Sequence, residues 1–359
     1  MVRFSDIVKN KPTKEEKAPK SEKDEKPLEP FRLSDLEGLK SSKDKKPEPK
    51  EAAIPKPEKE NGELGEIGKI YSSFQDYISE VKTSVLDDKP FKIDSALILL
   101  NKMINTPEMI NEIYQSSIHF SHEEDYTISR SINTLVYALK IGRGMQYSKT
   151  QLLELGLAAL LYDVGIFKIP DNIIKKEGRL TESEVATIRK HVEIGRDILS
   201  VFKEDYPWLS RVAYEHHERE NGQGYPRGVT GDEICEYAKI TGIVDTYEAM
   251  IHNRPHRKAI TQHFSVRELI WSKNLMFSSK VIKAFIKEIT LYPTGSYVRL
   301  NNKAVGMVTR TNEVNPMKPA VRLLFDGNGN AVTEETIIKL SESPLLYIMD
   351  SISEDEIPR

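Results

Sequence analysis

The sequence predicts a mainly α-helical protein, in which a helical bundle follows a disordered N-terminal tail and precedes a small β-barrel-like module. Three observations support this fold class. Residues 1–60 are rich in Lys, Glu and Pro, apolar residues in 61–290 recur at helical spacing, and apolar and polar residues alternate beyond Pro293. The chain has 359 residues and 38% hydrophobic content, enough for two or three domains with a real core.

Composition and charge exclude several classes of protein. The net charge of −3 gives no general case for nucleic-acid binding. The single cysteine, Cys235, excludes intramolecular disulfides and cysteine-based zinc ribbons. No run approaches the roughly 18 consecutive apolar residues that would span a membrane, and the N-terminus lacks the apolar segment of a signal peptide. We therefore expect a cytoplasmic protein without a membrane span or a nucleic-acid partner.

The N-terminal tail, residues 1–60, combines charges of alternating sign with repeated prolines. Such a segment cannot bury enough apolar surface to offset the entropy of ordering its chain, so we expect it to be disordered. Two islands, Arg3–Ile7 and Arg32–Leu36, share the pattern Arg-apolar-Ser-Asp-apolar. The repeat is either a coincidence in a biased composition or a short docking motif.

Residues 61–120 predict a helical lead-in with a structural role. Apolar residues recur at spacings of three and four between Ile67 and Val81. A second helix is expected after Asp94, which suits an N-cap, and Pro107 suits the first turn of a third.

Residues 121–290 predict a bundle of helices joined by loops. Leu152–Leu161 is apolar almost all round, as in a buried helix, and Asp163 follows it. A carboxylate at the end of a buried helix is costly unless it is paired or bound to a metal. Thr181 and Glu184 form a capping box that opens the next helix.

Imidazole and carboxylate groups come from separate helices of this bundle, each on or beside an apolar face. They are Asp163, His191 on the helix opened by the capping box, His216 and Asp245. One such group would most simply be a satisfied core residue, but four in one bundle indicate a shared metal site. His216 and His217 end a helical run. Gly222 and Gly224 are expected to bend the chain there, because glycine tolerates positive φ.

The segment beyond Pro293 predicts strands. Alternating residues mark three of them, Tyr297–Leu300, Ala304–Val308 and Val321–Phe325, and Asp326–Gly329 has turn chemistry. We expect a small β module over 291–345, with a role in packing or oligomerisation. An acidic tail, 346–359, is expected to follow it.

Four stretches together resemble the HD-GYP family, bacterial phosphodiesterases of the HD superfamily that hydrolyse cyclic di-GMP. They are HHERENGQGYP from His216, YDVGIFKIPDNII from Tyr162, HVEIG from His191 and AKITGIVDTYEAM around Asp245. The resemblance covers 121–290 and implies an all-α domain with a site for two or three metals, usually iron or manganese. The lead-in and the β module also look like additions that some family members have.

Departures from the family pattern concentrate on one metal position. The HD histidine falls on Tyr162, the upstream histidine on Arg130 and the lysine on Ile166. Tyr126 stands where three-metal members have a glutamate, and Asn221 replaces the aspartate of the signature. The resemblance therefore implies that the first metal loses two of its four ligands.

The other functional positions of the family are retained. The resemblance implies metal ligands at Asp163, His191, His216, His217 and Asp245. It implies nucleotide contacts at Arg254, Arg257 and Tyr225, and a docking loop formed by Gly222, Gly224, Tyr225 and Pro226. The expected cofactor is one divalent metal ion, iron or manganese rather than zinc. The expected partners are cyclic di-GMP and, through the loop, diguanylate cyclase (GGDEF) proteins, and the oligomeric state stays open.

These positions predict a degenerate HD-GYP protein that binds nucleotide or docks a partner, with weak or absent hydrolysis. A slow metal-dependent phosphodiesterase and a purely structural helical scaffold remain as alternatives. Arginine has no lone pair for a metal, so we expect Arg130 to act as a replacement cation. Its guanidinium should then lie within about 4 Å of Asp245 or Asp163, with the Tyr162 hydroxyl nearby.

Overall fold

The computed structural model describes residues 66–117, 125–252, 259–260, 262–271, 276–289, 292, 294–312, 315–352 and 356–358. The predicted N-terminal tail, with its two repeated islands, lies outside these residues. Arg254 and Arg257 also lie outside them.

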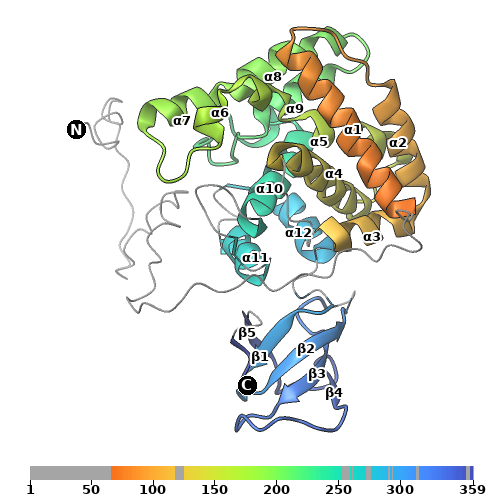
Figure 1. The fold of residues 1–359 in the computed structure, drawn as a ribbon, viewed down its shortest axis with the longest axis vertical. Coiled ribbons are helices and arrows are strands. Elements are labelled where there is room, and N and C mark those ends of the chain that lie inside the picture. The colour runs from red at the N-terminus through yellow and green to blue at the C-terminus, as the bar shows by residue number, and fades with distance from the viewer. Residues whose placement is uncertain are drawn as a thin grey trace, which may run out of the picture. The chain divides into compact units, whose positions relative to one another are not determined.

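The predicted lead-in forms three helices, α1 (Glu66–Leu86), α2 (Asp94–Asn105) and α3 (Pro107–Ser117). Asp94 is the first residue of α2 rather than its cap, and Pro107 begins α3 as expected. α1 and α3 contact α4, and α2 contacts α5 (Figure 1). The buried apolar residues of the three helices belong to the same hydrophobic core as the rest of the bundle. The boundary expected near residue 121 therefore does not separate two cores.

Helices α4 (Tyr126–Gly144) and α5 (Lys149–Leu161) pack against each other at the centre of the bundle. Their starts are fixed by side-chain caps: Asp125 accepts from the Thr127 amide, and Ser148 forms a capping box with Gln151. The segment Lys149–Lys168 is long and apolar enough to resemble a membrane span, but 78% of it is buried inside the protein. It therefore packs as the buried core helix that the sequence predicts.

The remaining helices of the bundle have the following bounds: α6 (Asp171–Ile174), α7 (Glu182–Arg189), α8 (His191–Leu199), α9 (Pro207–Glu215), α10 (Glu236–Ile251), α11 (Gln262–Trp271) and α12 (Ser279–Glu288). Thr181 and Glu184 form the predicted capping box at the start of α7. The helix expected to run on through His191 is divided at Lys190, however, so His191 begins α8 instead. The histidine thus occupies the first turn of a short helix.

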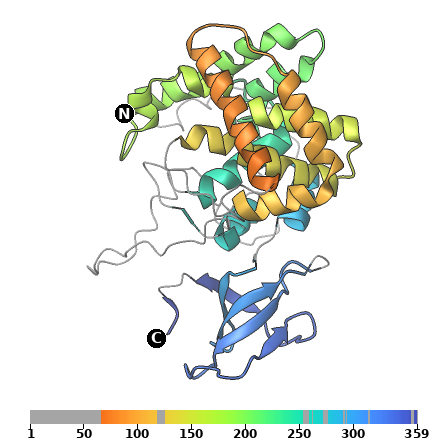
Figure 2. The ribbon, with the colours of Figure 1, turned by 45° about the vertical axis from the view of Figure 1, so that its right-hand side comes forward.

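The C-terminal module is an antiparallel sheet, drawn in blue in Figure 2. It has five strands in the order β4-β3-β2-β1-β5. Its strands are β1 (Tyr297–Leu300), β2 (Val305–Arg310), β3 (Ala320–Phe325), β4 (Ile337–Lys339) and β5 (Ile348–Ile352). The three predicted strands are present. The prediction of an acidic tail from residue 346 is wrong for Ile348–Ile352. These residues form β5, which pairs with β1 and buries Ile348 and Ile352.

Candidate functional site

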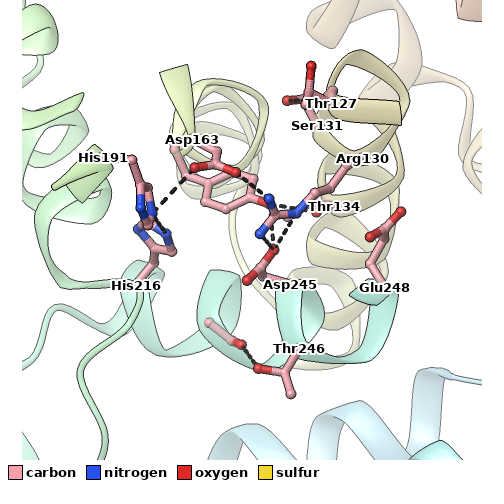
Figure 3. Close-up of polar contacts among 12 residues, drawn as sticks. Thr127, Arg130, Ser131, Thr134, Asp163, His191, His216, Asp245, Thr246 and Glu248 are labelled. Atoms are coloured by element: carbon pink, nitrogen blue, oxygen red, sulfur yellow. Dashed lines mark hydrogen bonds and ion pairs between the residues drawn. The ribbon is translucent and has the colours of Figure 1, made fainter. Parts of the chain in front are cut away.

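Five segments of the bundle bring charged and imidazole side chains together (Figure 3). Arg130 comes from α4, Asp163 from the turn after α5, and Asp245 from α10. His191 begins α8, and His216 with His217 follows the last residue of α9. They include all five metal ligands that the resemblance implies, together with Arg130.

Arg130 points inward and bonds both aspartates. Its Nη1 donates to Asp163 Oδ2 at 2.6 Å, and its Nε and Nη2 donate to Asp245 Oδ1 at 2.9 and 2.6 Å. All three side chains are buried. Burial alone would disfavour the charged guanidinium, but Asp163 and Asp245 outweigh this effect and raise the pKa of Arg130 well above its usual value. The predicted contact of Arg130 with the two carboxylates is confirmed.

Tyr162 completes this cluster. Its hydroxyl donates to Asp245 Oδ1 at 2.6 Å, so one carboxylate oxygen accepts from both the guanidinium and the phenol. Burial raises the pKa of the Tyr162 hydroxyl well above its usual value, so the phenol stays protonated and donates. Ile166, at the position of the family lysine, is buried and offers no charge.

Three histidines form a second cluster beside the first. Their ring nitrogens lie within 4.8 Å of one another, and they are His191, His216 and His217. His191 Nδ1 lies 2.7 Å from the Ile188 carbonyl oxygen, and His216 Nδ1 lies 2.9 Å from the Ala213 carbonyl oxygen. Each Nδ1 must carry its proton to donate to a carbonyl, which leaves Nε2 of a neutral ring as a bare lone pair.

The two Nε2 atoms of His191 and His216 face each other at 3.2 Å. Burial, with His191 next to it, lowers the pKa of His216 to about 3, so the ring of His216 is neutral near pH 7. When both rings carry their proton on Nδ1 alone, neither Nε2 has a proton to donate to the other. A metal cation between the rings would accept electron density from both Nε2 lone pairs. Histidines that bind metals usually donate their other ring N–H to an acceptor such as a backbone carbonyl, which fixes the orientation of the ring. The donor set therefore fits a metal ion.

Asp163 links the two clusters. Its Oδ2 accepts from Arg130, whereas its Oδ1 lies 3.4 Å from His191 Nε2. The close approach depends on Gly165, because a Cβ there would lie 2.0 Å from the His191 carbonyl oxygen and 2.5 Å from the Gly195 nitrogen. The glycine lets the turn after α5 lie directly against α8. Asp163 is thus placed to serve both a cation at Arg130 and a metal at the histidines.

The loop after His217 is closed by two glycines in different ways. Gly222 has a φ of +72°, the left-handed conformation expected from the sequence. Gly224 is needed for space instead, because a Cβ there would lie 2.5 Å from backbone atoms of Glu218, Arg219 and His217. The sequence-based explanation by positive φ is therefore wrong for Gly224.

Three buried glutamates support this region, and no role is predicted for them from the sequence. Glu218 accepts from the Arg227 and Val229 amides at 2.7 and 3.2 Å. Glu215 accepts from the side chains of Arg211 and Arg227 and from the Cys235 amide. Glu248, one turn beyond Asp245, accepts from Asn133 Nδ2 at 3.4 Å. The sequence signal for these glutamates is their position: Glu215 and Glu218 flank the two adjacent histidines, and Glu248 lies on the apolar helix α10.

Tyr225 lies against the histidines. Its ring stacks on that of His217, with the centroids 4.6 Å apart and the planes at 18°. Pro226 follows it in the same loop. The loop expected to dock a partner is therefore anchored on one of the candidate metal ligands.

Comparisons with known proteins agree with these motifs. The family model described as "HD domain" matches residues 89–276, and the "KOW domain associated with HD domain" matches residues 297–359. A cyclic di-GMP phosphodiesterase from Pseudomonas aeruginosa is 27% identical over 64% of this chain and 55% of its own length. Another, from Borreliella burgdorferi, is 30% identical over 58% of this chain and 54% of its own length. The chain spans about half the length of these curated relatives.

Among solved structures, an HDG"Y"P protein from Bdellovibrio bacteriovorus resembles the chain. The two share 15% sequence identity with a TM-score of 0.49, over 61% of this chain and 70% of that one.

Proposed function

Because the chain belongs to the HD domain family, and within it to the HD-GYP proteins, we propose that it binds cyclic di-GMP with weak or absent hydrolysis. The curated relatives are named as cyclic di-GMP phosphodiesterases, which supports this class of ligand and a role in cyclic di-GMP signalling.

The observation that supports lost hydrolysis is the position of Arg130. Its guanidinium bonds both Asp163 and Asp245, the two carboxylates that the resemblance assigns to the first metal. Arginine has no lone pair to offer a metal ion, and Tyr162 adds a third donor to Asp245 Oδ1. Two-metal hydrolases hold the attacking and leaving oxygens between their ions. With a guanidinium bonded to both carboxylates of the first metal position, only the second metal position keeps its ligands.

The second metal position keeps its donors. His191, His216, His217 and Asp163 would hold one divalent ion, for which we propose iron or manganese. Such an ion, when bound, would lower the pKa of a coordinated water and attract a phosphate oxygen. The chain's own part is to orient the histidines through the Ile188 and Ala213 carbonyls.

Calorimetry and a turnover assay with cyclic di-GMP test this proposal together. We expect the wild-type protein to bind the nucleotide, and chromatography to detect little or no linear product. Replacing both Arg254 and Arg257 with Ala should abolish binding, because the resemblance assigns them the nucleotide phosphates. Rapid turnover by the wild type, or no binding at all, would contradict the proposal.

A slow one-metal phosphodiesterase is the second candidate. It is favoured by the intact histidine cluster, in which the donors of one metal position are all present. Turnover that is slow, requires added metal and disappears in His216→Ala would support this candidate over a module without activity.

Docking through the loop is a separate proposal. Glu215 and Glu218 fix the loop through Arg227, Val229 and Cys235, which gives Tyr225 and Pro226 a defined position. We propose that this loop contacts a diguanylate cyclase (GGDEF) protein. Gln223→Glu, which changes the charge of an exposed loop residue, should weaken that complex in a pull-down while leaving nucleotide binding unchanged. An undiminished complex would count against docking through this loop.

A further inference from the structure

Arg189 lies beside the histidine cluster but outside every motif of the sequence analysis. It is the last residue of α7, and its guanidinium carbon lies 4.9 Å from the centroid of the Tyr225 ring. Tyr225 in turn stacks on His217, one of the three clustered histidines. A guanidinium, a phenol ring and a candidate metal ligand are therefore linked by direct ring contacts.

The backbone fixes Arg189 close to a second histidine. The preceding residue, Ile188, offers its carbonyl to His191 Nδ1 at 2.7 Å. Arg189 therefore stands in the same turn that orients His191, where the chain passes from α7 to α8.

The other arginines around the loop already have acceptors. Arg196 pairs with Asp197, Arg211 and Arg227 pair with Glu215, and Arg219 donates to the His216 and Glu218 carbonyls. Within the parts of the chain that the structure describes, no carboxylate or carbonyl pairs with Arg189, which is exposed. The side chain is exposed to solvent, and the cation–π contact with Tyr225 restricts the orientation of the guanidinium.

We propose that Arg189 contacts a phosphate oxygen of the bound cyclic dinucleotide. This inference rests on the nucleotide binding proposed above. The planar fork of an arginine matches phosphate oxygens, and a guanidinium already stacked on a ring loses less freedom when it binds. A phosphate held at the histidine cluster would lie beside the Tyr225 and His217 rings, within the region that Arg189 borders.

Arg196 offers a matched control. Its guanidinium lies 4.6 Å from the centroid of the Tyr214 ring, a similar cation–π contact, but it is paired with Asp197. We would compare wild type, Arg189→Ala, Arg189→Lys and Arg196→Ala by calorimetry with cyclic di-GMP at low and high salt. Metal content and melting temperature would be measured for each variant.

Arg189→Ala should raise the Kd for cyclic di-GMP by about tenfold to a hundredfold, the usual effect of losing a charged hydrogen bond. Arg189→Lys should retain part of the affinity, and Arg196→Ala should bind as the wild type does. The salt dependence of binding should be smaller in Arg189→Ala, because one ionic contact is gone. Metal content and melting temperature should not change.

The outcomes separate this inference from the proposed function. If the wild type binds and Arg189→Ala binds equally well, Arg189 does not contact the phosphate, and the proposed function stands. If Arg189→Ala loses metal or stability together with affinity, its role is structural and the inference is wrong. If the wild type does not bind cyclic di-GMP, the proposed nucleotide binding and this inference both fail.

Discussion

Arg130 is a buried cation between two buried carboxylates, and its energetics follow from that position. It donates three hydrogen bonds to Asp163 and Asp245. Removing one member of a buried charge cluster is far more costly than removing an exposed ion pair, because the remaining charges stay buried. The same guanidinium occupies the hydrogen-bonding oxygens of both carboxylates that the resemblance assigns to the first metal.

Arg130→Met should therefore destabilise the fold by about 3–5 kcal/mol in denaturant unfolding. The control is Arg196→Met, which removes an exposed pair with Asp197 and should cost less than about 1 kcal/mol. Equal losses in the two variants would show that the Arg130 cluster contributes no more than a surface pair.

Arg130→His alone should not create a second metal position. Tyr162 would still donate its hydroxyl to Asp245 Oδ1. Burial raises the pKa of this phenol well above its usual value, so it stays protonated and offers no anionic oxygen to a metal. The double variant Arg130→His, Tyr162→His returns two imidazoles to the positions that the resemblance assigns to the first metal. We expect only the double variant to bind a second ion, measured as metal per chain. A second ion in the single variant would show that Tyr162 is no obstacle.

At the scale of elements, the contact between the turn after α5 and helix α8 sets the distance between Asp163 and His191. Gly165 makes this contact possible, because a Cβ there would lie 2.0 Å from the His191 carbonyl oxygen. Gly195, on the facing helix, would place its Cβ no closer than 3.4 Å to any neighbour. Gly195 therefore serves as a control for substitutions at Gly165.

Gly165→Ala should separate the turn from α8 and reduce metal binding, measured as the metal retained after dialysis. It should also lower the melting temperature, because the clash is with backbone atoms that cannot rotate away. Gly195→Ala should be close to neutral, since alanine is favoured over glycine within a helix. Normal metal binding in Gly165→Ala would mean that Asp163 is not positioned by this contact.

Much of the helical architecture follows from local sequence signals. The capping box of Thr181 and Glu184, the start of α3 at Pro107 and the buried helix before Asp163 are all determined by neighbouring residues. The partners of Arg130 were accessible only through the resemblance, since Asp163 and Asp245 are 33 and 115 residues away.

Other features depend on tertiary contacts and were missed. The break at Lys190 lies between two segments that are each helical in pattern, and no glycine or proline marks it. Arg189 has an ordinary helical context, so its position over Tyr225 emerges only when the loop folds back. The close approach at Gly224 likewise depends on backbone atoms of Glu218 and Arg219 rather than on its own φ.

At the scale of the whole molecule, the last strand also depends on tertiary contacts that the local sequence does not reveal. The acidic composition of the C-terminal segment suggested a tail, but β5 (Ile348–Ile352) pairs with β1 and buries an isoleucine at each end. The composition of a short edge strand predicts it poorly, because the strand is held by backbone hydrogen bonds to a strand that is distant in the sequence.

Truncation tests this correction. A chain ending after Leu345 loses β5 and should lose amide protection in β1, Tyr297–Leu300, in hydrogen exchange. A chain ending after Ile352 should retain that protection, because the whole strand is kept. Unchanged protection in the shorter chain would mean that β5 adds nothing to the stability of the sheet.

The central claim is that Arg130 occupies one metal position and leaves one intact at His191, His216, His217 and Asp163. The most direct test is the number of divalent ions bound per chain, determined by elemental analysis after loading the wild-type protein with manganese and removing free metal. The account predicts one ion per chain in the wild type and none in His216→Ala. Two ions per wild-type chain would contradict it.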